Sequence, residues 1–193
     1  MNVDITLPDG SVRNYESPVT GYQIAESIGP RLLKDAICVE IDNKFQDLSY
    51  EISESINIRI VTTKDLDALH ILRHSSAHIL AQAVLNLYPN AQFGVGPSIE
   101  NGFYYDFLFE TPIKENELEK IEKEMKRIAK SAQSFIRSEI TKKDAVKIFK
   151  NQKLKLELIE SAESDEGVGE EIVSTYANDK FIDLCMGPHV PST

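Results

Sequence analysis

Two pairs of rare side chains, each with a spacing of four residues, are the candidates for chemistry in this sequence. His74 and His78 form one pair, and Cys185 and His189 form the other, more than 100 residues further along the chain. The chain has only four histidines and two cysteines, so the two pairs use most of both residue types. Residues four apart on a helix share one face, so a helical pair can aim two proton-transferring groups at one point. If the fold joins the pairs, the resulting cluster could handle a water molecule or a metal ion.

The elements that must position these pairs can be predicted from local patterns. A long helix is expected from about Asp67 to Leu87, ended by Pro89, and it carries the first pair near its middle. Short strands at Ile172–Tyr176 and Phe181–Leu184 are expected to deliver Cys185. The apolar face of the helix is formed by Leu69, Leu72, Ala77, Leu80, Val84 and Leu87.

Two further charged residues are candidates for the same site. Asp183 precedes Cys185 by two residues, so in a strand it shares a face with it and could orient a histidine or a substrate amine. The alternative is an ordinary surface carboxylate at a strand end. Lys155 lies in the alternating Lys/Leu pattern of Lys153–Ile159, which predicts a strand with one wet face. On that strand, Lys155 would be exposed to solvent.

Aromatic and glycine residues in the middle of the chain give weaker indications. The segment Phe103–Phe109 is rich in aromatic residues and predicts a strand. Tyr104 and Tyr105 would point to opposite faces of it, so one could pack in the core while the other faces a cleft. Gly94 and Gly96 are expected to serve a turn, because the helix, Lys and Ser/Thr of a phosphate-binding loop do not follow them.

The first 62 residues predict a small β-grasp unit without a catalytic constellation. Thr20 and Gln23 have the spacing of a capping box, which predicts a helix over Gly21–Ile28 that ends at Gly29-Pro30. Strands are expected near Val3–Leu7, Ser11–Tyr15, Ala36–Ile41 and Ile56–Val61, with turns at Pro8-Asp9-Gly10 and Asp42-Asn43.

The rest of the chain is expected to form a second, larger α+β unit with a mostly antiparallel sheet. Residues 63–66 are expected to be a linker, which gives domains at 1–62 and 67–193. Leu118, Ile121, Met125 and Ile128 mark an amphipathic helix. A strand near Phe135–Ile140, a helix beginning after Thr141 and an acidic, glycine-containing loop over Glu163–Glu170 should follow.

Charge is distributed unevenly along the chain. The net charge is −10, yet residues 113–155 hold 13 Lys/Arg against 7 Asp/Glu. A basic stretch on an acidic body can still meet a phosphate backbone, although it could equally be a solvated helix face. Two widely spaced cysteines, no signal peptide and no long apolar run indicate a cytoplasmic protein with reduced thiols and no membrane partner.

The combined motifs are similar to a known family. H-x-x-x-H on a helix with C-x-x-x-H at a strand exit resembles the editing domain shared by threonyl- and alanyl-tRNA synthetases. The segments HSSAHILAQAV (74–84), GPSIENGFYYDF (96–107) and DLCMGPHVP (183–191) resemble the threonyl type. The first 62 residues resemble the TGS domain that precedes it in bacterial enzymes, so the resemblance covers the whole chain.

The resemblance implies a site and a reaction. His74, His78, Cys185 and His189 would form the editing cleft, with Asp183, Lys155 and Tyr105 beside them. Met186 occupies a position where relatives often carry Arg. The implied activity is hydrolysis of seryl-tRNA(Thr) at its aminoacyl ester, so the expected partners are the acceptor end of tRNA(Thr) and serine. Threonyl editing domains are regarded as working without a metal, so no cofactor is expected.

The resemblance also implies what lies outside this sequence. The catalytic core and the anticodon-binding domain of the synthetase, with their ATP, Mg²⁺ and Zn²⁺, should follow residue 193, and the full-length enzyme would be a homodimer. The chain is therefore expected to be an N-terminal fragment, truncated at the C-terminal end of its second domain. Two alternatives stay open: a zinc-dependent aminoacyl-tRNA hydrolase of the alanyl type, with the His/His/Cys/His set as ligands, and a non-catalytic tRNA-binding module.

Overall fold

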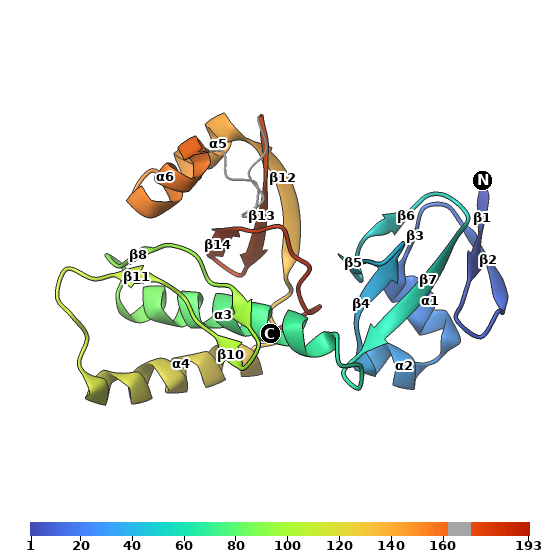
Figure 1. The fold of residues 1–193 in the computed structure, drawn as a ribbon, viewed down its shortest axis with the longest axis horizontal. Helices are drawn as coiled ribbons and strands as arrows, with labels where there is room; N and C mark the ends of the chain where they lie inside the picture. Colours follow the sequence, from blue (N-terminus) through green and yellow to red (C-terminus); the bar gives the residue numbers. More distant parts are fainter. Residues whose placement is uncertain (162–170) are drawn as a thin grey trace. The chain divides into compact units, whose positions relative to one another are not determined.

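The computed structural model describes residues 1–161 and 171–193 and contains two compact units. One consists of Met1–Leu72 with Pro188–Pro191, and the other of Arg73–Gly187 with Ser192–Thr193 (Figure 1). The loop predicted over Glu163–Glu170 lies outside the described residues. The predicted domain ranges 1–62 and 67–193 stay predictions.

The first unit is built on a mixed five-stranded sheet with the order β2-β1-β7-β4-β5. Strands β1 and β7 pair in parallel, and the other neighbours are antiparallel. A separate two-stranded ladder joins β3 to β6. The strands are β1 (Asn2–Thr6), β2 (Val12–Glu16), β3 (Val19–Thr20), β4 (Ala36–Ile41), β5 (Lys44–Asp47), β6 (Glu51–Ile52) and β7 (Ile56–Thr62).

Helix α1 (Gly21–Ile28) has the predicted bounds, and its N-terminus carries the predicted capping box. The Thr20 side chain accepts from the Gln23 backbone N–H, and the Gln23 side chain accepts from the Thr20 N–H, so two otherwise unpaired donors are satisfied. A short helix that was not predicted, α2 (Pro30–Asp35), begins directly after Gly29. Proline is compatible with the first turn of a helix, so Pro30 starts α2 instead of only ending α1.

The segment after β7 is attached to the sheet by one arginine. Arg59 on β7 forms ion pairs with Glu40 (2.5 Å), Asp65 (3.1 Å) and Asp67 (2.7 Å). Asp65 also accepts from the backbone N–H of Thr62. Asp65, one of the residues predicted as a linker, is therefore held against β7 by an ion pair and a hydrogen bond.

In the second unit, helices pack on one another next to a small sheet (Figure 1). Helix α3 (Ala68–Leu87) confirms the predicted long helix, and α4 (Leu118–Lys130) confirms the predicted amphipathic one. Ala83 and Val84 of α3 share a buried cluster with Ile121 and Ile128 of α4. A 3-10 turn, η1 (Glu115–Glu117), precedes α4.

The sheet of the second unit is antiparallel, in the order β12-β13-β14. Its strands are β12 (Ile136–Thr141), β13 (Ile172–Asn178) and β14 (Phe181–Leu184). Two-residue ladders join β8 (Gln92–Phe93) to β11 (Phe107–Leu108), and β9 (Ser98–Ile99) to β10 (Gly102–Phe103). Helices α5 (Lys142–Ile148) and α6 (Lys153–Ser161) follow β12, and the Thr141 side chain caps α5 as predicted. The helices and sheets of the two units confirm the predicted α+β class with mostly antiparallel strands.

Two strand predictions were wrong. Residues Lys153–Ile159 lie in helix α6, where Lys155 and Ile159, four residues apart, are its buried side chains. A helix face, not an alternating strand face, therefore buries Lys155. The segment Phe103–Phe109 is not one strand, because only its ends pair. Tyr104 and Tyr105 do differ in environment as predicted, with 45% and 8% of their surfaces exposed.

Within the described parts of the chain, every helix is too short or too polar to cross a lipid bilayer.

Candidate functional site

Helix α3 presents both histidines of the first pair one turn apart. The rings of His74 and His78 meet edge to face, with centroids 5.1 Å apart. His78 is buried, with contacts to the rings of Phe135 and Phe181, whereas His74 is half-buried. The spacing of four residues thus has the predicted effect of aiming two imidazoles at one place.

Cys185 follows directly after β14 and is fixed by its backbone. Its N–H donates to the carbonyl of Ser174 (3.1 Å), and the Ser174 hydroxyl donates to its carbonyl (2.6 Å). The Cys185 Sγ accepts from the N–H of Gly187 (3.2 Å) and lies 3.0 Å from His74 Nε2 in a hydrogen bond whose donor depends on the imidazole tautomer. Gly187 has a φ of 77°, a conformation that favours glycine, and residues 185–190 form no turn.

The two predicted pairs meet. One ligand atom each from His74, His78, Cys185 and His189 lies within 4.8 Å of the others. Three imidazole nitrogens and one thiol form a donor set that suits Zn²⁺ as well as a positioned water. The cluster can therefore serve either of the two chemistries considered from the sequence.

Three buried residues, Lys155, Asp183 and Tyr105, lie beside the cluster and form a hydrogen-bonded triad. Lys155 Nζ is 2.6 Å from Asp183 Oδ1, and both side chains are almost completely removed from solvent. The ammonium also donates to the carbonyl of Gly94 (2.5 Å) and to the hydroxyl of Tyr105 (3.2 Å). The Tyr105 hydroxyl donates in turn to Asp183 Oδ2. The interpretations of Lys155 as a solvated lysine and of Asp183 as a surface carboxylate were therefore wrong.

The triad reaches the cluster through His78. His78 Nε2 lies 3.7 Å from Asp183 Oδ2. Burial lowers the pKa of His78 well below its ordinary value, and the neighbouring His74 and Lys155 lower it further. His78 is consequently a neutral imidazole at physiological pH. Burial also raises the pKa of Asp183, although the ammonium of Lys155 and the hydroxyl of Tyr105 act in the opposite direction.

Gly96 supports the triad in a way that sequence reasoning missed. A Cβ atom on Gly96 would lie 2.1 Å from Cδ2 of Tyr105, so only glycine lets the tyrosine ring approach this backbone. Residues 94–97 form no turn, so the prediction of a turn at Gly94 and Gly96 was wrong. A glycine followed nine residues later by a tyrosine gives no signal for such an approach in sequence alone.

Comparison with known proteins shows what the chain is similar to. Residues 3–62 match the family model of the TGS domain. Over 193 residues, 99% of the chain, the sequence is 48% identical to a threonine–tRNA ligase of Paraburkholderia phytofirmans and 47% identical to one of Francisella philomiragia. A threonine–tRNA ligase of Ralstonia nicotianae is 46% identical over the same length. Along nearly its whole length the chain is therefore similar to the N-terminal part of threonine–tRNA ligases.

The match to the ligase family has a defined extent. The chain spans about 30% of the length of these curated relatives. The TGS match falls entirely within the first structural unit, whose sheet and α1 have the β-grasp arrangement expected from the sequence. The His/Cys cluster and the triad lie outside the TGS match, so their roles are argued from their chemistry.

Proposed function

We propose that this chain is the proofreading part of a threonine–tRNA ligase and hydrolyses seryl-tRNA(Thr). A synthetic site that fits threonine must admit some serine, because one missing methylene is worth only ~1–3 kcal/mol of discrimination. A second, smaller site that accepts serine and excludes the extra methyl can correct that error. The observation that carries the proposal is the convergence of His74, His78, Cys185 and His189 within 4.8 Å.

The reaction in this proposal is ester hydrolysis without a covalent intermediate. Water attacks the carbonyl carbon of the aminoacyl ester, the bond to the ribose oxygen breaks, and a proton is delivered to that oxygen, which releases serine. His74 is assigned to accept the proton from water, because it is the half-buried member of the cluster and so stays in reach of solvent. His78, neutral and buried, and His189 shape the pocket.

The remaining residues hold the site in place. Asp183 is assigned to the amino group of the substrate, since its Oδ2 lies 3.7 Å from His78 Nε2 of the cluster and a cationic amine would share it with Lys155. Lys155 already has three polar partners, which favours a role in positioning Asp183 over direct proton transfer. Tyr105 fixes the other carboxylate oxygen. Cys185 is assigned to a water or substrate contact.

The test measures release of serine from mischarged seryl-tRNA(Thr). The His74→Ala variant should lose most of the rate, on the order of the 10²–10⁴-fold that a general base contributes. Cys185→Ala should keep nearly full activity. His70→Ala is the matched control, because His70 is an exposed histidine on the same helix outside the cluster. Loss of activity in Cys185→Ala with retention in His74→Ala contradicts the assignment.

A zinc-dependent hydrolase is the second candidate, and the donor set of the cluster favours it. In that case the three histidines and Cys185 would hold the ion, which would supply an activated water. A third candidate, a non-catalytic tRNA-binding module, is favoured by the basic residues between 113 and 155. Binding of seryl-tRNA without hydrolysis would support it. The same proposal includes a location in the cytoplasm and a full-length ligase that is a homodimer.

A further inference from the structure

Residues 92–108 form a long, irregular hairpin that supplies one member of the triad. Its base is the β8–β11 ladder, and its tip is the β9–β10 ladder. Between the two ladders, the N–H of Gly94 donates to the carbonyl of Asp106 (2.9 Å), and the N–H of Asp106 donates to the carbonyl of Val95 (3.0 Å). Tyr105 lies in this middle part, and its hydroxyl bonds to the other two members of the triad. The position of the hairpin therefore determines where that hydroxyl lies.

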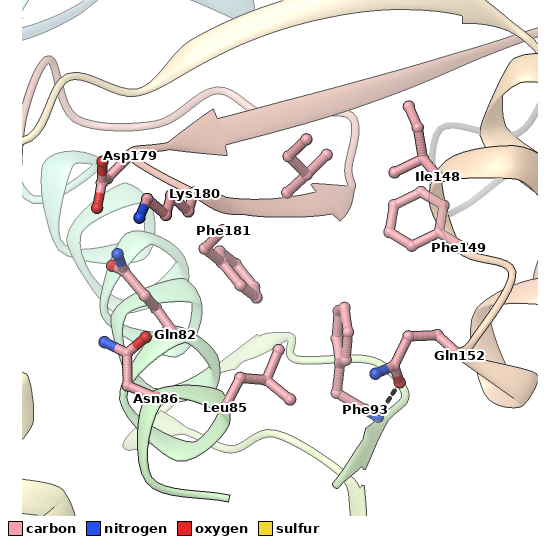
Figure 2. A pocket seen from close by; sticks show the side chains of 11 residues that line it. Gln82, Leu85, Asn86, Phe93, Ile148, Phe149, Gln152, Asp179, Lys180 and Phe181 are labelled. Carbon is pink, nitrogen blue, oxygen red and sulfur yellow. Dashed lines mark hydrogen bonds between the residues drawn. The ribbon is translucent and has the colours of Figure 1, made fainter. Parts of the chain in front are cut away.

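The base of the hairpin is attached to the residues at the start of α6, the helix of the triad lysine. The side chain of Gln92 donates to the carbonyl of Asn151 (3.0 Å) and accepts from the N–H of Lys153 (2.7 Å). The side chain of Gln152 accepts from the N–H of Phe93 (3.2 Å), a bond drawn in Figure 2. These bonds fix one end of the hairpin next to the triad.

The tip of the hairpin is attached to a different element, helix α3. Arg73 Nη1 donates to the carbonyls of Ile99 (3.2 Å) and Glu100 (2.5 Å). Hydrogen bonds from a charged donor are stronger than those between neutral groups. Ile99, Glu100 and Asn101 are exposed, so this turn buries little apolar surface, and a two-stranded ladder has little stability of its own in water. The attachment of the turn to α3 therefore depends on the guanidinium of Arg73.

Arg73 directly precedes His74, the residue assigned to accept a proton from water. Successive residues on an α-helix are rotated by about 100°, so the two side chains leave the helix in different directions. The arginine reaches the hairpin, whereas the histidine reaches Cys185 Sγ (3.0 Å). One turn of α3 thus carries both the assigned base and the anchor of the hairpin that contains Tyr105.

We propose that Arg73 is a positioning residue that makes the site distinguish serine from threonine. The proposal rests on the proposed function, in which Asp183 holds the amino group of the substrate and His74 activates the water. Arg73 fixes the distance between these two groups, because it connects the helix of His74 with the hairpin whose Tyr105 orients Asp183. A single methylene is worth only roughly 10- to 200-fold in discrimination, so a small shift of the pocket removes it.

The first test measures single-turnover hydrolysis, with the 193-residue chain in excess over seryl-tRNA(Thr) or threonyl-tRNA(Thr). In Arg73→Ala, the maximal rate constant for the seryl ester should fall by about 10- to 100-fold, because a misplacement of about 1 Å can cost that much. The chain concentration that gives half the maximal rate should change little, since Arg73 bonds to the protein itself. The ratio of the seryl to the threonyl rate constant should fall by about tenfold. Arg73→Lys keeps a charged donor and should regain part of both quantities.

Asn86→Ala is the matched control for this substitution. Asn86 lies on the same helix (Figure 2), and its side chain donates to Glu124 on α4 (2.7 Å). Its removal also costs α3 a bond to another element, but it leaves the hairpin attached, so rate and discrimination should match the wild type. Wild-type values in Arg73→Ala, or equal losses in Arg73→Ala and Asn86→Ala, would overturn the proposal. If Arg73→Ala does not fold, the same comparison is made with Arg73→Lys, for which smaller losses are expected.

Binding of analogues that cannot be hydrolysed separates this proposal from the proposed function. The probes are the seryl and threonyl amides of an adenosine in which an amine replaces the ribose hydroxyl. If the wild-type chain prefers the seryl amide and Arg73→Ala loses that preference, while no serine is released from seryl-tRNA(Thr), the role of Arg73 stands and the hydrolase is refuted. If serine is released but Arg73→Ala keeps the wild-type preference, the hydrolase stands and the role of Arg73 is refuted.

Discussion

Lys155 and Asp183 form an ion pair at 2.6 Å in which each side chain is almost fully buried. Taking two charges out of water is costly, and their attraction compensates only if the remaining polar atoms are satisfied. The carbonyl of Gly94 and the hydroxyl of Tyr105 provide that satisfaction. The pair connects α6 with β14, and therefore holds the strand that leads into Cys185.

Removing one member of this pair should destabilise the second unit strongly. Asp183→Asn or Lys155→Met leaves an uncompensated buried charge or a broken network, which costs about 3–5 kcal/mol. Denaturant unfolding of the chain measures the loss. Lys153→Met, on the same helix but exposed, is the control and should change the unfolding free energy by less than about 0.5 kcal/mol. A pair that contributes only to catalysis would leave the stability of both variants unchanged.

Gly96→Ala should disable the site through Tyr105. The added methyl would lie 2.1 Å from the tyrosine ring, so the ring must move and its hydrogen bond to Asp183 is broken. We expect the stability to fall by about 1–3 kcal/mol, as for overpacking in a core, together with a loss of seryl-tRNA hydrolysis. Thermal unfolding and the serine-release assay measure the two effects.

Gly102→Ala is the control for this substitution. Gly102 lies in the same unit, and a Cβ atom there would meet nothing within 4 Å. Its activity should match that of the wild type. If Gly96→Ala and Gly102→Ala have the same stability and the same rate of serine release, the close approach of Tyr105 to Gly96 does not affect function.

Local patterns in the sequence predicted helices such as α1 and α3, whereas contacts with residues further along the chain determined which side chains are buried. The capping box at Thr20 gave the bounds of α1, and the helical spacing of apolar residues gave α3 and its two histidines. The strand assigned around Lys155 failed because a lysine between leucines normally faces water. Asp183, 28 residues later, together with Gly94 and Tyr105, makes its burial on a helix favourable. The role of Gly96 likewise depends on a contact with Tyr105, nine residues further along the chain.

The buried thiol of Cys38 should make the folding stability of the chain fall at alkaline pH. Burial raises the pKa of this thiol to about 12, with Asp47 adding to the effect. The unfolded chain loses the proton near the ordinary value of about 8.5, so the folded state binds more protons between these two values. The stability that Cys38 contributes is therefore complete below about pH 8.5 and is lost as the pH rises toward 12.

Chemical denaturation of the first unit between pH 8 and 11 tests this dependence. The wild type should lose more stability than Cys38→Val, with a difference in slope of at most about 1.4 kcal/mol per pH unit. The comparison of the two proteins removes the contribution of tyrosines and lysines that titrate in the same range. Parallel curves would show that Cys38 does not carry the effect.

Metal content distinguishes the two hydrolytic mechanisms. The proposed function predicts that the chain purified without added metal holds zinc well below one equivalent, and that a chelator leaves serine release unchanged. The hydrogen bond between His74 and Cys185 would then persist, because no ion replaces its proton. Elemental analysis and the serine-release assay with and without chelator measure both points. Zinc at one equivalent, removed together with activity and regained on its return, would instead assign the His/Cys cluster to a metal and require Cys185→Ala to be inactive.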